Sequence, residues 1–249
     1  MKTPLSDLLP TLSKAILRLP RGTGPALVMG SAPNFRLPQG HDGGWALVTV
    51  NASQLLAETF GLPVPDIALI RRGILVGDSE QDFYKRDLLK GRQAKHLIVP
   101  IWPDVEDKLK AGCRTFNYRY DTLQALTKWQ LANIVWRLSG KYHVSRGWHR
   151  KISTGVFAIT LARFAGFAPV VVSGFSLSQA GHGYDTRNAF RYHVDEDADL
   201  LRRMVRRGEP IYAEDGDFAA ESGLPLWQGT DAMMARPNGD NGQGLEASS

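Results

Sequence analysis

Cysteine is almost absent from this chain, whose 249 residues include a single one, Cys113. One cysteine cannot form an internal disulfide, and such sparse use is typical of a reducing compartment. No motif of a cysteine-dependent enzyme surrounds Cys113. We therefore predict that Cys113 is a packing residue of the core.

Long apolar runs are also missing. No stretch approaches the roughly 18 apolar residues that a membrane-spanning helix needs. The first residues lack the uninterrupted apolar core and the small-residue cleavage site of a secretory signal. We expect a cytoplasmic protein, with peripheral contact at the inner face of the cytoplasmic membrane left open.

The motifs of several common ligand-binding classes are not found either. The segment Gly30–Asn34 has neither the lysine and glycine spacing of a P-loop nor the G-x-G-x-x-G pattern. No aspartate cluster of the Asp-x-Asp metal type follows a predicted strand, and Asp195–Asp197 is typical of a helix start. We expect no metal and no other cofactor.

Charge is distributed unevenly along the chain. Residues 1–194 contain 25 Lys and Arg against 13 Asp and Glu, whereas residues 195–249 contain 5 against 12. The basic excess in residues 1–194 would attract phosphorylated substrates, anionic lipid surfaces or nucleic acid. The interpretation of the chain as an RNA-binding protein rests on charge alone, because no zinc finger, basic zipper or RNA-recognition strand accompanies the charge. Nucleic acid is therefore not an expected partner.

The chain does contain short apolar runs that alternate with helical patterns. Near-continuous apolar strands are typical of a parallel sheet that is covered on both faces. We predict an α/β fold, a mostly parallel Rossmann-like sheet flanked by helices, with a small lid at 141–151. The predicted strands are 26–29, 45–50, 66–70, 95–99 and 170–175, and the predicted helices are 54–60, 78–90, 104–111, 121–139, 156–162 and 194–207, with 114–120 left as strand or loop.

Three regions make up the predicted organisation. Residues 1–22 form an amphipathic helix that packs on its own sheet or lies on a membrane surface. Residues 23–235 form the main domain, and 236–249 form a disordered tail rich in Gly, Asn and Ser. Within the main domain, the 121–139 helix has the strongest pattern, with Asp121 and Thr122 as its cap. Its Trp129, Ile134 and Trp136 are expected in the core.

Candidate ligand contacts follow the predicted strands and open one helix. Gly30 and Ser31 form a tight turn after the first strand, where backbone amides can approach a phosphate. Asn51 ends the second strand, and it serves either as a ligand contact or as a turn asparagine. Ser153, Thr154 and Gly155 open an apolar helix, and such helix starts bind anions.

A second group of candidates follows the 170–175 strand. Parallel α/β sheets bind ligands at the carboxyl ends of their strands. His182, Tyr184 and His193 all come after this strand, and their side chains can donate to a phosphate or accept a proton. A phosphate-binding helix start, hydrogen-bond donors for a leaving group and a general base together suggest a transferase. Such an enzyme would use a nucleotide-activated donor substrate.

With these residues in hand, the chain resembles the sialyltransferases of glycosyltransferase family 29, with similarity to the bacterial sialyltransferases of family 42. Residues 27–34 and 47–51 resemble the two halves of the family's large motif. Residues 153–155, together with the following helix, strand and Gly174-Phe175, resemble the small motif. Residues 181–184 resemble the third motif, and His193 resembles the histidine of the very small motif.

The resemblance implies a sialyltransferase-like fold and a metal-independent, inverting transfer from a CMP-sugar to a surface glycan or glycolipid. The donor is sialic acid or a related ulosonic acid such as Kdo. The resemblance places the donor at Gly30, Ser31, Asn51 and the segment 153–155, and the departing phosphate at His182 or Tyr184. His193 would be the general base.

Two departures from the family pattern keep an alternative open. Ser31 stands where the family usually has asparagine, and no glutamate follows His193 at the usual interval, so that Glu196 or Asp197 would have to substitute. A catalytically inactive nucleotide-binding module would retain the phosphate-binding helix start and tolerate both changes.

Overall fold

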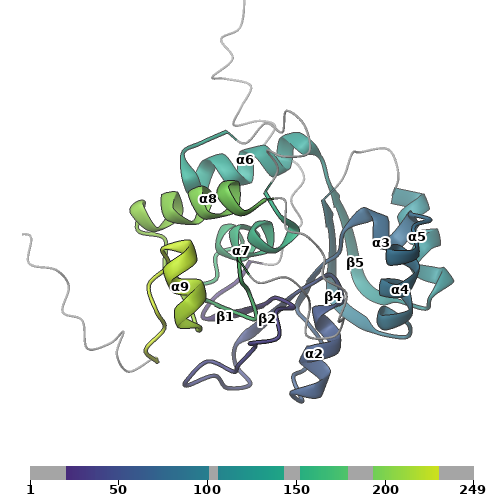
Figure 1. Ribbon diagram of the computed structural model, residues 1–249. Coiled ribbons are helices and arrows are strands. Elements are labelled where there is room, and N and C mark those ends of the chain that lie inside the picture. Colours follow the sequence, from purple (N-terminus) through teal and green to yellow (C-terminus); the bar gives the residue numbers. More distant parts are fainter. Residues whose placement is uncertain (1–20, 101–105, 143–151, 179–192, 230–249) are drawn as a thin grey trace, which may run out of the picture.

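The computed structural model describes residues 21–100, 106–142, 152–178 and 193–229. The predicted N-terminal helix and C-terminal tail therefore lie outside the described residues, except for positions 21 and 22, and so does most of the predicted lid. The described chain folds around one sheet with helices on both faces (Figure 1). The predicted fold class is confirmed.

All the paired strands of this sheet run parallel, in the order β5-β4-β3-β2-β1-β6-β7. The chain builds outward from β1 in one direction through β5 and then returns to place β6 on the other side of β1. This reversal creates a topological switch point between β1 and β6, where open α/β sheets bind ligands. The strands are β1 (Ala26–Met29), β2 (Ala46–Val50), β3 (Ile67–Leu69), β4 (Gln93–Pro100), β5 (Arg119–Leu126), β6 (Val170–Ser173) and β7 (Ile211–Ala213).

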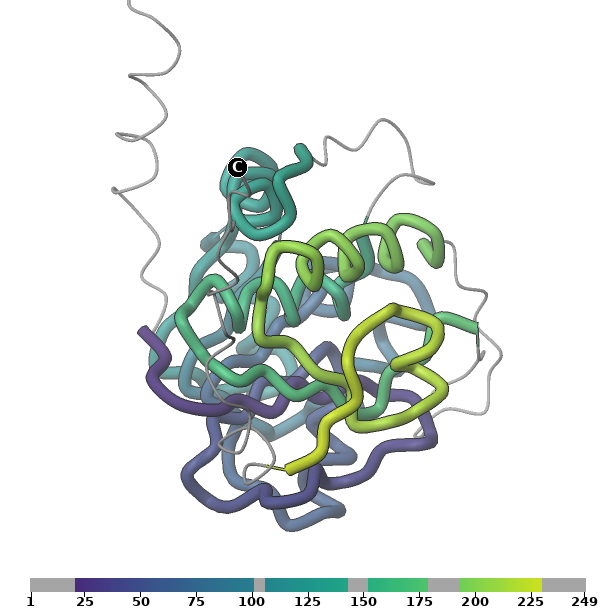
Figure 2. The backbone as a smooth tube through the Cα atoms, turned by 90° about the vertical axis from the view of Figure 1, so that its left-hand side faces the viewer, coloured from purple at the N-terminus to yellow at the C-terminus, as the bar shows by residue number. Residues whose placement is uncertain are grey.

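Two sets of helices cover the two faces of the sheet (Figure 1). The first half of the chain supplies one face, which carries α2 (Gln54–Thr59), α3 (Arg72–Val76), α4 (Glu80–Leu89) and α5 (Glu106–Thr115). The second half supplies the other, with α6 (Lys128–Ser139), α7 (Thr154–Phe164), α8 (Val194–Arg206) and α9 (Gly216–Ser222). In the view of Figure 2, α8 and α9 lie nearest the viewer, over the β6 and β7 side.

The apolar strands have this composition because both of their faces are buried. In β1, Ala26 and Val28 pack toward α7, whereas Leu27 and Met29 pack toward Trp45 and α2. Successive side chains of a strand point to opposite faces, so a strand covered on both sides must be apolar at every position. Cys113 on α5 is buried as predicted, and burial raises the pKa of its thiol to about 12.

The predicted 121–139 helix is wrong in its first third. Residues 121–126 belong to β5, which pairs in parallel with β4 along its length. The helix begins at Lys128, because the Thr127 hydroxyl accepts from the Gln130 amide and the Gln130 side chain accepts from the Thr127 amide. This reciprocal capping box, and not Asp121-Thr122, marks the helix start. The helix ends at Gly140, which adopts a left-handed φ of 71°.

Two tryptophans of α6 also differ from the prediction. Ile134 is buried, but the Trp129 side chain is 72% exposed and Trp136 is 40% exposed. The apolar pattern of α6 is wider than the stripe that faces the sheet, so part of it remains on the outer surface.

Short elements were missed where the sequence pattern is too brief to recognise. These are α3, β7, α9 and the 3-10 turn η1 (Asn51–Ser53). No helix in the described parts of the chain is long and apolar enough to cross a bilayer.

Candidate functional site

The ends of β1 and β6 meet at the switch point through two glycines. The Gly30 amide donates to the Ser173 carbonyl at 2.9 Å. A Cβ atom on Gly30 would lie 2.2 Å from the Gly174 carbonyl oxygen and 2.6 Å from the Phe175 ring. Gly174 has a left-handed φ of 69°. Both positions require glycine, because one has no space for a side chain and the other has a backbone conformation that L-residues disfavour.

The start of α7 packs against the same aromatic ring. A Cβ atom on Gly155 would lie 2.8 Å from the Phe175 ring. Phe175 thus touches both Gly30 and Gly155, which come from distant parts of the sequence. The amides of the first turn of a helix have no intrahelical acceptor, so those of Thr154 and Gly155 form an electropositive helix start. The Phe175 ring lies between this helix start and the Gly30 turn, because the two glycines approach opposite edges of the ring.

Ser153 is the N-cap of α7. Its hydroxyl accepts from the Val156 amide at 3.1 Å, and its own amide donates to Asp197 Oδ1 at 2.8 Å. The Ser153 hydroxyl therefore stabilises the helix start. Asp197 lies in the first turn of α8 and is buried.

His193 immediately precedes α8 and is joined to this arrangement through Asp197. The His193 carbonyl accepts from the Asp197 amide at 2.9 Å, while the Asp197 carboxylate binds Ser153. The starts of α7 and α8 are therefore adjacent, on the same face of the sheet (Figure 1). The backbone of His193 is thus linked through Asp197 to Ser153, at the start of α7.

Asn51 lies at the carboxyl end of β2 with a left-handed φ of 52°. Its Oδ1 accepts from the Arg71 amide at 2.9 Å, which ties the end of β2 to the turn after β3. Of the two predicted roles, the turn role applies to the amide oxygen, and the Nδ2 hydrogens point to no acceptor among the described residues.

Two buried serines that the sequence did not single out fix the turns of the site. The Ser53 hydroxyl accepts from the Val50 amide and donates to the Met29 carbonyl, both at 2.8 Å. The Ser173 hydroxyl donates to the Arg36 carbonyl at 2.6 Å and accepts from the Arg36 amide at 3.1 Å. These bonds hold the turn from Gly30 to Arg36, and Ser31 lies within it, partly exposed.

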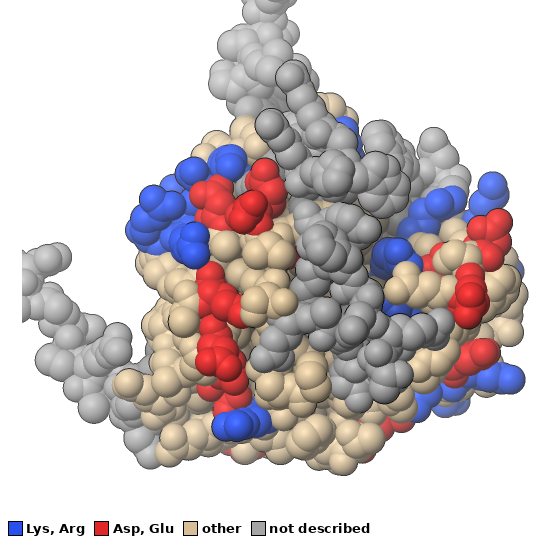
Figure 3. All heavy atoms as spheres, in the orientation of Figure 1, with Lys and Arg blue, Asp and Glu red and all other residues tan. Residues whose placement is uncertain are grey.

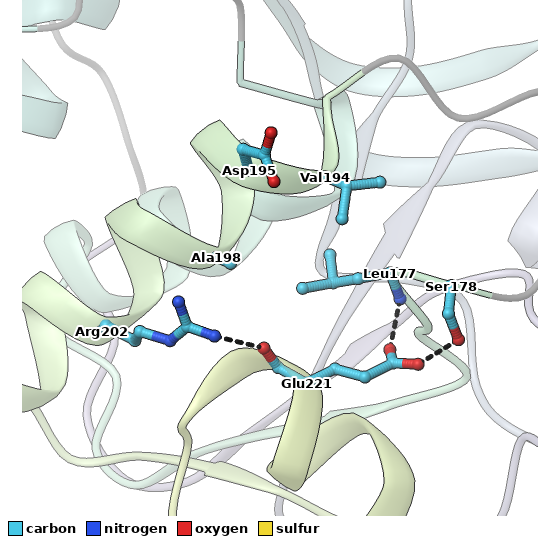
Figure 4. A pocket seen from close by; sticks show the side chains of 7 residues that line it. All are labelled: Leu177, Ser178, Val194, Asp195, Ala198, Arg202 and Glu221. Atoms are coloured by element: carbon cyan, nitrogen blue, oxygen red, sulfur yellow. Dashed lines mark hydrogen bonds between the residues drawn. The ribbon is translucent and has the colours of Figure 1, made fainter.

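His182 and Tyr184 lie outside the described residues. The described chain stops at Ser178 and resumes at His193, and a cavity of about 320 Å³ lies between these two points, α8 and α9 (Figure 4). The Glu221 carboxylate of α9 accepts from the Leu177 amide at 2.6 Å and from the Ser178 hydroxyl. Glu221, which sequence reasoning missed, thus holds the end of the segment that leads to His182.

One further acid lies at this edge of the sheet. Glu214 follows β7, and its amide donates to the Val172 carbonyl at 2.9 Å. Burial raises the pKa of the Glu214 carboxyl; Asp215 adds to the increase, and Arg36 opposes it. No group of three His, Cys, Asp or Glu side chains among the described residues is arranged to hold a metal ion.

Neither a protein-family model nor a curated protein sequence matches this chain. Solved structures do match. The sialyltransferase CstII from Campylobacter jejuni, in complex with cytidine-5'-monophosphate, shares 12% identity over 83% of this chain and 87% of its own, with a TM-score of 0.55. CstII with a trisaccharide acceptor and CMP shares 13% identity over 82% and 86%, with a TM-score of 0.54.

A third structure is similar to the same extent. The monofunctional alpha-2,3-sialyltransferase Cst-I from Campylobacter jejuni shares 13% identity over 86% of this chain and 82% of its own, with a TM-score of 0.53. At these identities the likeness is one of fold. This chain has the fold of the bacterial sialyltransferases CstII and Cst-I.

Proposed function

We propose that this protein transfers sialic acid, or a related ulosonic acid such as Kdo, from its CMP ester to a glycan or glycolipid acceptor. The proposal is supported by two observations: the Gly30 turn and the start of α7 both contact Phe175, and Asp197 links the start of α7 to the backbone of His193. The structures with the same fold are sialyltransferases in complex with CMP, which supports cytidine as the nucleotide.

The donor phosphate would lie at the amides of Thr154 and Gly155, with the Gly30–Ser31 turn at the opposite edge of the Phe175 ring. In the reaction, the bond between the anomeric carbon and the phosphate oxygen breaks and CMP leaves with the electron pair. Backbone amides and the α7 dipole stabilise the negative charge that develops on this phosphate. This contribution needs no metal ion. We propose that His182 or Tyr184 adds a hydrogen bond to the same oxygen.

The acceptor hydroxyl would attack the anomeric carbon from the side opposite the phosphate, which inverts the configuration there. His193 would take the proton of that hydroxyl as the new carbon–oxygen bond forms. A positioned general base contributes about 10²–10⁴-fold in rate. Asp197, which we considered as a substitute for the missing glutamate, is buried against Ser153 and acts by fixing the helix that carries His193.

A nucleotide panel scored by melting temperature tests the proposal. CMP should raise the melting temperature in the presence of a chelator, whereas UDP and NAD should not. CMP release from CMP-sialic acid and from CMP-Kdo, each with a glycan acceptor, then identifies the donor. A requirement for Mg²⁺ or Mn²⁺, or a preference for UDP, would contradict the proposal.

His193→Ala should lose about 10²–10⁴-fold in CMP release while CMP binding is retained. His41→Ala is the matched control, because His41 precedes β2 and so lies toward the opposite, amino edge of the sheet. CMP binding without release of CMP from any donor would favour the inactive nucleotide-binding module, which the departures at Ser31 and after His193 suggest.

A further inference from the structure

The outer surface of α6 exposes aromatic side chains in a row. Trp129 and Trp136 are seven residues apart, which places them on the same side of the helix two turns apart. Their side chains are 72% and 40% exposed. Tyr142, just beyond the helix, stacks on Trp136 with ring centroids 5.3 Å apart and planes 18° from parallel. Aromatic side chains in such a row form an apolar strip instead of isolated surface residues.

Positive charge surrounds this strip. Helix α6 contains no acidic residue, and Arg137 lies one turn from Asn133, to which it donates. The end of α8 adds Arg206 and Arg207, and a Cβ atom on Gly140 would lie 3.1 Å from Arg207 Nη1. Figure 3 shows Lys and Arg gathered over this outer end of α8.

The nearby acid does not neutralise these arginines. Asp199 pairs with Lys141 at 2.8 Å and with Arg203 at 2.9 Å, so its charge is already shared. In the described parts of the chain, Arg137, Arg206 and Arg207 form no ion pair. The result is an aromatic-basic face, which we define as Trp129, Trp136, Tyr142, Arg137, Arg206 and Arg207.

We propose that this aromatic-basic face docks on an anionic lipid membrane surface. Tryptophan and tyrosine favour the boundary between headgroups and acyl chains, because their rings are apolar and their polar edges remain hydrated. Lysine and arginine near the surface gain affinity from anionic lipids. A second copy of the chain is the poorer occupant, because two such faces would oppose like charges.

The position of α6 relates this face to the candidate site. Helix α6 starts at Lys128, two residues after the end of β5, so Trp129 lies at the carboxyl edge of the parallel sheet. The Gly30 turn and the start of α7 lie at the same edge. The Trp129 end of the aromatic-basic face therefore lies at the edge of the candidate site, whereas Arg206 and Arg207, which precede β7, lie toward the opposite edge. The docking itself does not depend on the proposed transfer reaction.

Sedimentation with vesicles tests the proposal on the full chain. The probes are vesicles of phosphatidylcholine alone and of phosphatidylcholine mixed equally with phosphatidylglycerol. The protein should bind the mixed vesicles, and added salt should weaken the binding. Trp129→Ala should weaken it on the order of tenfold through lost apolar burial. Arg206→Gln with Arg207→Gln should weaken it about fivefold per arginine, which corresponds to about 1 kcal/mol for each.

Matched controls come from the opposite face of the sheet. Phe83→Ala removes an exposed aromatic ring from α4, and Lys90→Gln with Lys108→Gln removes two exposed cations there. These controls should bind as the unchanged chain does, and all variants should keep its melting temperature within a few degrees.

Three results would overturn the proposal. The first is the absence of binding to mixed vesicles. The second is full binding by the Trp129 and arginine variants, which would assign membrane contact to another segment such as residues 1–20. The third is a change in the molecular mass in solution on Trp129→Ala without a change in vesicle binding, which would make this face an interface between copies.

Discussion

At the scale of single residues, Gly30 has no room for even one added carbon. In Gly30→Ala the new methyl group would lie 2.2 Å from the Gly174 carbonyl oxygen, which belongs to the backbone and cannot rotate away. Overpacking of this kind costs about 1–3 kcal/mol and shifts the backbone. We expect a lower midpoint in urea denaturation and weaker CMP binding. Gly43→Ala is the control, because nothing lies within 4 Å of its added carbon, and it should change neither.

Asp197 is the second residue for which the structure gives a clear expectation. Asp197→Ala would leave the partly buried Ser153 amide without its acceptor, which costs on the order of 1 kcal/mol, and would uncouple the starts of α7 and α8. Asp197→Asn retains an amide oxygen in the same place. We expect the alanine variant to lose most of its turnover and the asparagine variant to keep the larger part. Equal losses in both would instead indicate that the negative charge of Asp197 acts in the reaction.

Residue-scale prediction from sequence succeeded where the physical reason is local. Gly30 and Ser153 were recognisable because a tight turn after a strand and a helix N-cap have their own residue preferences. The roles of Ser53, Asp197 and Glu221 depend on partners far away in the sequence, namely Met29, Ser153 and Leu177. No local pattern marks such pairs, so these partnerships became visible only in the structure.

At the scale of elements, the junction between β5 and α6 shows how two valid local signals can compete. Asp121 and Thr122 are good helix-capping residues, and so is Thr127, which also has Gln130 three residues later. Pairing with β4 decides between them, because Leu123 to Leu126 align with Leu97 to Pro100. The prediction for the same helix was also wrong about Trp129 and Trp136, because it placed these apolar side chains in the core although they are exposed.

The ion pairs of Asp199 with Lys141 and Arg203 join the end of α6 to the middle of α8, and their contribution to stability should depend on pH. Burial acts to raise the pKa of Asp199, but hydrogen bonds from Lys141 and Arg203, together with their charges, outweigh it and lower the pKa to about 2. A lowered pKa means that folding favours the ionised form, so the stabilisation is present above pH 4 and is lost as pH falls toward 2.

Urea denaturation of the unchanged chain and of Asp199→Asn measures this effect. The side chain is partly exposed, so the two should differ by roughly 0.5–1 kcal/mol at neutral pH, and the difference should shrink between pH 4 and pH 2. Arg92→Gln, which breaks the pair with Glu58 on the other face of the sheet, is the comparison for a surface pair elsewhere. A difference that stays constant down to pH 2 would contradict this account.

At the scale of the whole molecule, the class of the fold was predictable and the order of its strands was not. Apolar runs separated by helices imply a parallel sheet, because each strand must be covered on both faces. That β6 lies beside β1 depends on contacts such as Gly30 with Gly174, which join residues far apart in the chain. β7 was missed because it has only three residues and lies at an edge of the sheet, where Tyr212 is only half-buried.

From this strand order we predict where a nucleotide should bind. If CMP binds at the switch point, hydrogen exchange should slow in residues 30–36, 51–53 and 153–157, which come from three separate parts of the sequence. Binding selects the closed form of each turn, so their local opening becomes rarer. Helix α5 lies on the β4 and β5 side and should be unaffected. Slower exchange confined to the cavity beside Glu221, or to α5, would place the nucleotide elsewhere and remove the reason for joining the Gly30 turn, the start of α7 and His193 into one site.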